Sequence, residues 1–230
     1  MSDEFAADVA SIAALSEPVR RALYRYVVDQ DGPVSRENAA AGVGVAHHVA
    51  KFNLDRLVSD GLLDVEYRRP PGRTGPGAGR PTKLYRRTAR DIAVSLPERH
   101  YDLAGQVLAD AVTAAGRDRR PVADTLRAAA RNAGHRMAEA AGHGPAAEPR
   151  QAVGDVLARH GYEPRSISDG IVLANCPFHS LARDYTDLVC GMNLDLIGGV
   201  LDRVCPGRMT ARLDPAPGRC CVTISEPADR

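Results

Sequence analysis

The chain has 230 residues, of which 44% are hydrophobic and 26% charged, and its formal net charge is +1. This composition is typical of a soluble globular protein with one or two domains. No run of about 18 apolar residues occurs, which excludes a membrane-spanning helix. The acidic start, Met-Ser-Asp-Glu-Phe, lacks the features of a secretion signal, so we expect a cytoplasmic protein.

The small net charge hides an asymmetry along the chain. Residues 16–90 hold 14 Lys and Arg against 8 Asp and Glu, a net charge of +6 that leaves about −5 for the remainder. A basic part joined to an acidic part is the layout expected of a factor that binds nucleic acid through one of them.

The N-terminal third predicts four helices and a pair of strands. Residues 4–15 and 18–30 have helical apolar spacing, with Ser16 expected to cap the second helix. Ser35 can cap a short third helix. A fourth helix, over 46–59, follows a turn at two glycines, and a strand over 62–67 comes next.

This order of elements is that of a helix-turn-helix with a wing, in which the second helix of the motif enters the DNA major groove. The alternative is an ordinary pair of packed helices. The stretch that follows decides against it, because residues 67–90 hold eight basic residues and no acidic one. Their Gly- and Pro-rich middle, 70–81, predicts a mobile loop before a second strand at 82–87.

An arginine-bearing loop of this kind suits phosphates or the minor groove. The predicted DNA-binding residues are Ser35, His47, His48, Lys51, Arg68, Arg69, Arg73, Arg80 and Lys83.

Three phrases carry a family resemblance: Leu15-Ser-Glu-Pro-Val-Arg-Arg-Ala-Leu23, Leu54-Asp-Arg-Leu57 with Gly61-Leu62, and Gly79-Arg-Pro-Thr-Lys-Leu-Tyr85. Together they resemble the winged helix-turn-helix regulators of the ArsR type. The resemblance covers residues 12–90 and implies a regulator, expected to be a repressor, that binds a double-stranded DNA operator.

The middle of the chain predicts two further helices, over 101–115 and 121–141. Winged-helix proteins read paired half-sites as dimers, so we expect these helices to form the interface of a homodimer. The alternative is that they merely pack on their own winged-helix domain. A linker of glycine, proline and alanine follows, over 142–149.

The last seventy residues predict a small β-β-α-β-β sensor domain. A hairpin over 166–175 turns at Asp169-Gly170, a helical region covers 179–204, and a second hairpin covers 208–225. The predicted fold class is α+β, mostly helical. Its three parts are a winged helix-turn-helix domain at 1–95, a helical dimerisation linker at 96–145 and the sensor domain at 146–230.

Cysteines are confined to that last part. The chain has five: Cys176, Cys190, Cys205, Cys220 and Cys221. Without a secretion signal, structural disulfides are not expected, and metal, cluster or redox chemistry gains weight. The chain has no Cys-x2-Cys pair of the kind found in zinc ribbons. The alternative to a chemical role is that the cysteines are small buried hydrophobic residues.

The phrases Asn175-Cys-Pro-Phe-His179, Leu188-Val-Cys190 and Gly218-Arg-Cys220 resemble the C-terminal sensor of SufR-type regulators. That resemblance, over 170–225, implies an iron–sulfur cluster as cofactor, with zinc or no cofactor as alternatives. The predicted metal ligands are Cys176, Cys190 and Cys220, and His179 is a candidate for a fourth position because imidazole binds iron and zinc.

Simple geometry refines this ligand set. A strand over 219–225 would place Cys220 on the core face and Cys221 on the other. Cys205 would lie too far along the opposite strand. One straight helix from Cys176 to Cys190 would separate them by about 21 Å, so shared ligation requires a break near 185–188.

Two readings of the function remain open. One is a regulator that senses a metal or iron–sulfur cluster through its cysteines. The other is a regulator that senses an organic ligand or thiol oxidation. We expect no enzyme and no catalytic residue, since the chain has no Gly-rich phosphate loop, serine elbow or His-Glu-x-x-His motif.

Overall fold

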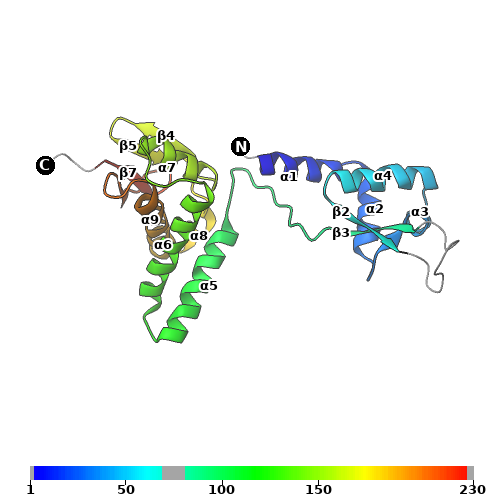
Figure 1. Cartoon of the computed structure of the whole chain (residues 1–230), viewed down its shortest axis with the longest axis horizontal. Helices are drawn as coiled ribbons and strands as arrows, with labels where there is room; N and C mark the ends of the chain where they lie inside the picture. Colours follow the sequence, from blue (N-terminus) through cyan, green and yellow to red (C-terminus); the bar gives the residue numbers. More distant parts are fainter. Residues whose placement is uncertain (1–2, 69–80, 227–230) are drawn as a thin grey trace. The chain divides into compact units, whose positions relative to one another are not determined.

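The computed structural model describes residues 3–68 and 81–226, drawn in colour in Figure 1. The chain divides into two compact units, residues 1–94 and 95–230. The first unit ends at residue 94, and the N-terminal domain was expected to end at residue 95. The predicted helical linker and sensor domain, however, are parts of one unit, because the helices of the linker pack into the core of the sensor domain.

The first unit combines helices with a three-stranded antiparallel sheet in the order β1-β3-β2. Its elements are α1 (Asp3–Ala14), α2 (Pro18–Val28), β1 (Val34–Ser35), α3 (Arg36–Val43), α4 (His47–Ser59), β2 (Leu63–Arg68) and β3 (Thr82–Arg87). The predicted order of helix, turn, helix and two strands is confirmed. The two-residue strand β1 is too short to be recognised from periodicity.

Local hydrogen bonds explain where these helices begin and end. Ser35 caps α3 as expected, accepting a hydrogen bond of 3.1 Å from the N–H of Asn38. Gly44 ends that helix with φ of 74°, a left-handed conformation that glycine adopts without strain. The prediction that Ser16 caps α2 is wrong: Glu17 is the N-cap, because its longer carboxylate reaches the first free N–H groups of the helix.

The apolar face of α4 is buried as the sequence predicted. Leu54 and Leu57 are fully buried, together with Leu23 of α2 and Tyr85 of β3. The opposite face of α4 is therefore left to solvent, which is the condition for entering a DNA groove.

The second unit packs helices against a four-stranded antiparallel sheet in the order β4-β5-β7-β6. Its elements are α5 (Tyr101–Asp118), α6 (Val122–Ala140), α7 (Pro149–Ala158), β4 (Pro164–Ile167), β5 (Gly170–Leu173), α8 (His179–Asp184), α9 (Thr186–Val204), β6 (Thr210–Leu213) and β7 (Val222–Ser225). The predicted β-β-α-β-β order is observed. Helices α5 and α6 lie side by side as a hairpin (Figure 1), and α6 also packs along α9.

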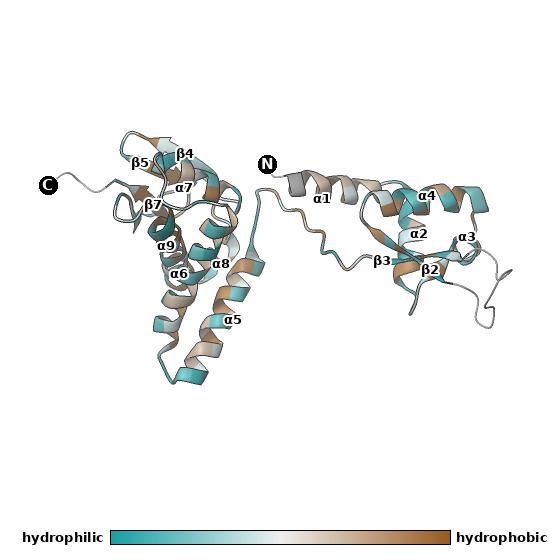
Figure 2. Cartoon of the chain, in the orientation of Figure 1, coloured by the Kyte–Doolittle hydropathy of each residue, from teal (hydrophilic) through white to brown (hydrophobic). Residues whose placement is uncertain are grey.

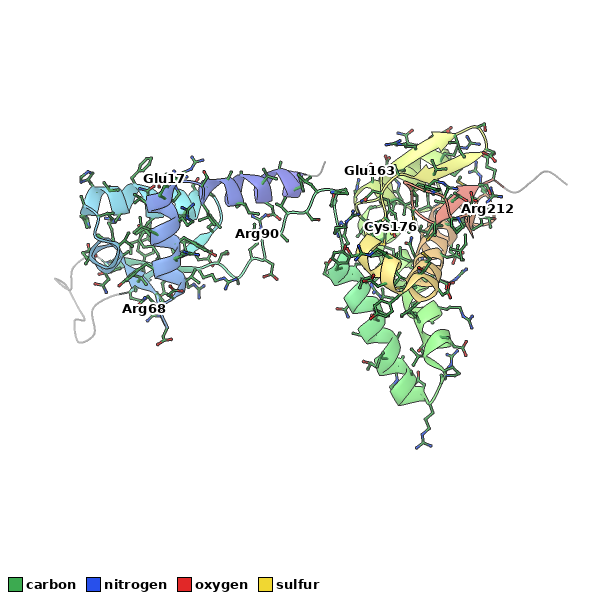
Figure 3. The ribbon with its side chains drawn as sticks, turned by 180° about the vertical axis from the view of Figure 1, so that it is seen from behind. Glu17, Arg68, Arg90, Glu163, Cys176 and Arg212 are labelled. Atoms are coloured by element: carbon green, nitrogen blue, oxygen red, sulfur yellow. The ribbon has the colours of Figure 1, made fainter. Side chains whose placement is uncertain are left out.

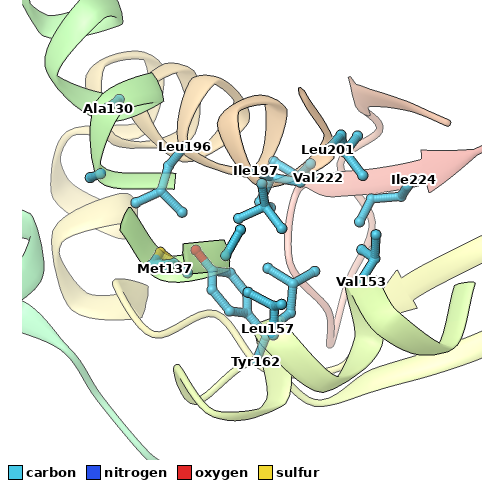
Figure 4. Packing of buried hydrophobic residues seen from close by; sticks show 14 of the residues in the cluster. Ala130, Met137, Val153, Leu157, Tyr162, Leu196, Ile197, Leu201, Val222 and Ile224 are labelled. Atoms are coloured by element: carbon cyan, nitrogen blue, oxygen red, sulfur yellow. The ribbon is translucent and has the colours of Figure 1, made fainter. Parts of the chain in front are cut away.

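The core of this unit joins all its layers. Figure 4 shows Ile197 of α9 beside Val222 of β7, and Leu196 of α9 and Leu157 of α7 belong to the same buried cluster. Polar and apolar residues alternate along α5 in Figure 2, as expected of a helix with one buried face. Within residues 3–68 and 81–226, no helix is both long and apolar enough to cross a membrane.

Two glycines allow α6 and α9 to approach closely. A Cβ built on Gly134 of α6 would lie 2.0 Å from the carbonyl oxygen of Leu196, and one on Gly199 of α9 would lie 2.2 Å from that of Arg131. Both obstacles are backbone atoms, which cannot rotate away. Glycine at these positions therefore sets the distance between the two helices.

We expect Gly134→Ala to destabilise the second unit by about 2 kcal/mol or more, because the two helices would have to separate. Gly105→Ala is the matched control: it lies in α5 with no atom within 4 Å of the new Cβ, and alanine should stabilise that helix by up to about 1 kcal/mol. Urea unfolding followed by circular dichroism compares the two variants. Equal midpoints would contradict this account of the packing.

Candidate DNA-binding surface and cysteine site

The exposed face of α4 carries three of the predicted DNA-binding residues. The side chains of His47, His48 and Lys51 are exposed. His48 lies on the side of the helix away from the buried Leu54 and Leu57, and His47 is exposed as the first residue of the helix. His47 lies 3.2 Å from a carboxylate oxygen of Glu37, an exposed pair that becomes an ion pair when the imidazole is protonated.

Lys83, predicted to contact DNA, is already engaged within the unit. Its ammonium donates to the carboxylate of Asp55, which also accepts a hydrogen bond of 2.8 Å from the hydroxyl of Tyr85. Partial burial opposes ionisation of Asp55, but the hydrogen bonds from Lys83 and Tyr85 outweigh it and lower its pKa. This charged contact ties β3 to the recognition helix α4.

The other residues predicted to contact DNA, and the neighbouring Arg90, are either engaged within the unit or outside the described residues. Arg68, at the end of β2, forms an ion pair with Glu66, and Arg90 forms one with Asp8 (Figure 3). Ser35 serves as the cap of α3. Arg69, Arg73 and Arg80 lie outside the described residues.

One residue of the recognition helix was not singled out from the sequence. The side chain of Phe52 is 68% exposed on the outward face of α4, next to Lys51. The sequence signal that could have found it is its spacing, because Phe52 falls outside the set of helix positions that carry the buried leucines.

The chain breaks between α8 and α9 as predicted. Helix α8 ends at Asp184, Tyr185 has φ of −134° and ψ of 55°, and α9 begins at Thr186. The break lets Cys176, before α8 (Figure 3), and Cys190, in the first turns of α9, belong to the same cluster of thiols.

Four thiols form that cluster: Cys176, Cys190, Cys220 and Cys221. The thiol of Cys220 hydrogen-bonds with those of Cys176 and Cys221, which with burial raises its own pKa. The bond with Cys220 lowers the pKa of Cys176. Bonds with Cys220 and then Cys190 lower the pKa of Cys221 to about 6, and burial raises that of Cys190 to about 12.

The prediction that Cys221 points away from this cluster is wrong. Strand β7 begins only at Val222, and the two preceding residues do not follow its alternation. In the hairpin, Leu213 of β6 pairs with Val222, so neither cysteine has a partner in the ladder. As a result the thiols of both adjacent cysteines face Cys176 and Cys190 rather than opposite sides of a sheet.

Buried polar groups hold the cluster in place. The side-chain N–H of Asn193 lies 3.2 Å from the sulfur of Cys220, and the Asn193 oxygen accepts a hydrogen bond from the buried Tyr162 hydroxyl. Arg99 donates to the carbonyl oxygen of Cys176 at 2.7 Å and to the side chain of Asn175 at 2.5 Å. Sequence reasoning missed Asn193 and Arg99, whose partners are 27 or more positions away.

The other two candidates lie differently. The imidazole of His179 is exposed at the start of α8, so its part as a ligand stays a prediction. Cys205 is buried directly after α9, and burial raises its pKa. Among the residues that the structure describes, no three His, Cys, Asp or Glu side chains are arranged to hold a metal ion.

The comparisons with known proteins bear on the first unit. A family model described as a helix-turn-helix domain matches residues 15–66, which run from the end of α1 to β2. No curated protein matches the chain, and no solved structure matches it either. Together with the capped α3, the glycine turn and the exposed face of α4, this match identifies residues 15–66 as a helix-turn-helix domain, the DNA-binding part of a transcription regulator.

Proposed function

We propose that this protein is a winged-helix transcription regulator of the ArsR type, a repressor whose second unit senses an iron–sulfur cluster or a metal ion through its cysteines. The observation that carries the sensing proposal is the gathering of four thiols from three separate segments of the chain. Thiolates are the ligands that iron–sulfur clusters and zinc prefer.

The donor set is one that such a group uses, since all four side chains are thiols. Cys176, Cys190 and Cys220 are the proposed ligands, and Cys221 is a stronger candidate than His179 for the fourth position because its sulfur already contacts two of them. Arg99 lies near Cys176 and Arg219 near Cys221, where their positive charges favour thiolates. A cluster, when bound, supplies a centre whose loss reports oxidants or a shortage of iron.

A second candidate is a thiol switch, favoured by the contact between Cys190 and Cys221. Oxidation of this pair would form a disulfide, with two electrons and two protons passing to an oxidant such as a peroxide, which is reduced to water. The two candidates are distinguishable, because the first predicts a bound metal ion or cluster and the second predicts a disulfide between two of the same four cysteines.

Anaerobically purified protein should show broad visible absorption and contain iron with inorganic sulfide, or else stoichiometric zinc without colour. We expect Cys176→Ser, Cys190→Ser and Cys220→Ser each to lose the bound group, while Cys205→Ala retains it. Comparing Cys221→Ser with His179→Ala identifies the fourth ligand.

Metal that persists in all three serine variants would refute the cysteine site. A metal-free protein in which mass spectrometry finds a peroxide-induced disulfide between Cys190 and Cys221 would favour the thiol switch instead.

Operator binding should depend on Lys51, which is exposed on the outward face of α4. We expect Lys51→Ala to weaken binding to the operator. The paired change Arg80→Ala, Lys83→Ala should also weaken it, and should flatten the dependence of the logarithm of affinity on the logarithm of salt concentration by about one unit per lost phosphate contact. The exposed Arg159 of the second unit provides the control variant Arg159→Ala. Titrations at several salt concentrations that give one affinity and one slope for all variants would exclude this surface.

The regulator should act as a homodimer, because one recognition helix covers only a half-site of a few base pairs. Val112 of α5 and Val122 of α6 are 60% and 48% exposed, and are candidates for the interface. We expect sedimentation of the wild type at micromolar concentration to give a mass about twice that of one chain, 24.6 kDa. Val112→Glu should lower the measured mass towards that of one chain. Ile167→Glu, at an exposed position of β4, should leave the dimer intact. A wild-type species of 24.6 kDa alone would argue against dimerisation.

A further inference from the structure

An exposed phenylalanine lies on the outward face of the recognition helix. Phe52 is 68% exposed, whereas Leu54 and Leu57 on the other face of α4 are fully buried. The core of the first unit closes without this ring. Stability therefore gives no reason for a large apolar side chain at this position, and aromatic side chains are enriched at binding interfaces.

The surroundings of Phe52 are polar and favour a nucleic acid. Lys51 and His48 are exposed neighbours on the same side of α4. The carboxylate of Asp55, one turn further along, is neutralised by Lys83 and Tyr85 and so repels phosphates less. The face thus places one lysine, one histidine and a carboxylate with its own charged partner around one apolar ring.

The major groove offers one apolar group to such a ring. Lys and Arg contact phosphates and fix the position of a DNA-binding protein, while base edges are read by side chains of the recognition helix. Each base pair presents hydrogen-bonding groups in that groove, and thymine adds the C5-methyl group, which accepts apolar contacts from side chains such as phenylalanine. A phenylalanine can discriminate bases only through that contact, because its ring carries no donor or acceptor.

We propose that Phe52 is a specificity-determining residue that packs against the C5-methyl group of a thymine in the operator. This inference rests on the proposed operator binding. It predicts a thymine in each half-site whose methyl group, rather than its hydrogen-bonding edge, is recognised. A 5-methylcytosine in the same place would present the same methyl group, with an amino group in place of the oxygen.

The test separates the methyl group from the rest of the base. The full chain first selects its preferred duplex from a randomised library. Each thymine of that duplex is then replaced singly by uracil, which lacks only the methyl group. We expect one position per half-site at which uracil weakens binding roughly fourfold, the effect of exposing one buried methyl.

Two variants connect that position to Phe52. Phe52→Ala should bind the thymine duplex about as weakly as the wild type binds the uracil duplex, or more weakly, and should no longer distinguish the two bases. Phe52→Gln, which keeps a long side chain without an aromatic ring, should behave alike. Ile167→Ala removes an exposed apolar side chain from the second unit and should retain the full preference for thymine.

The outcomes are distinguishable. If the wild type selects a duplex but no uracil substitution weakens binding, or if both Phe52 variants retain the uracil penalty, the inference about Phe52 is overturned while operator binding stands. If the wild type enriches no duplex at all, operator binding fails and the inference fails with it. Loss of the thymine preference in both variants, with wild-type circular dichroism, supports the inference.

Discussion

The cysteine site depends on the hydrogen bonds of one buried amide, that of Asn175. Its N–H groups donate to the carbonyl oxygens of Glu98 at 2.9 Å and Gly161 at 2.6 Å, and its oxygen accepts from Arg99. Arg99 in turn binds the carbonyl oxygen of Cys176. Because both donors and the acceptor of the amide are used, losing it would leave several groups unpaired in the interior. The position of Cys176 is therefore linked to residues 98–99, which open the second unit.

The contacts among the four thiols act on them in opposite directions. Cys220 hydrogen-bonds with Cys176 and Cys221, and Cys221 also with Cys190, three contacts that four protonated thiols can satisfy because each donates one proton. These contacts lower the pKa values of Cys176 and Cys221, while hydrogen bonds and burial raise that of Cys220. A bound metal ion would replace the thiol protons, and a disulfide would remove the protons of the two sulfurs that it joins.

The sequence was most informative where one local rule decides the structure. The spacing of Leu54 and Leu57 predicted the buried face of α4, and Thr82 to Arg87 was recognised as a strand with its full length. Failures arose where a boundary shifted by a few residues. Starting β7 at Val222 rather than at Arg219 removes the alternation on which the orientation of Cys221 was argued, since a side chain changes face with each residue of a strand. Partners far apart in the chain, such as Asn193 and Cys220, had no local signal at all.

The basic residues of the first unit do not contribute equally to DNA affinity. Lys83 is partly buried and held by Asp55, so moving it to a phosphate would leave Asp55 without its charged partner. Arg68 and Glu66 form a more exposed pair, of the kind that contributes little to stability and that a phosphate can replace. Each cation that reaches a phosphate steepens the salt dependence by about 0.9. The salt slope should therefore be smaller than the eight basic residues between 68 and 90 would suggest, because Lys83 mainly fixes β3 against the recognition helix.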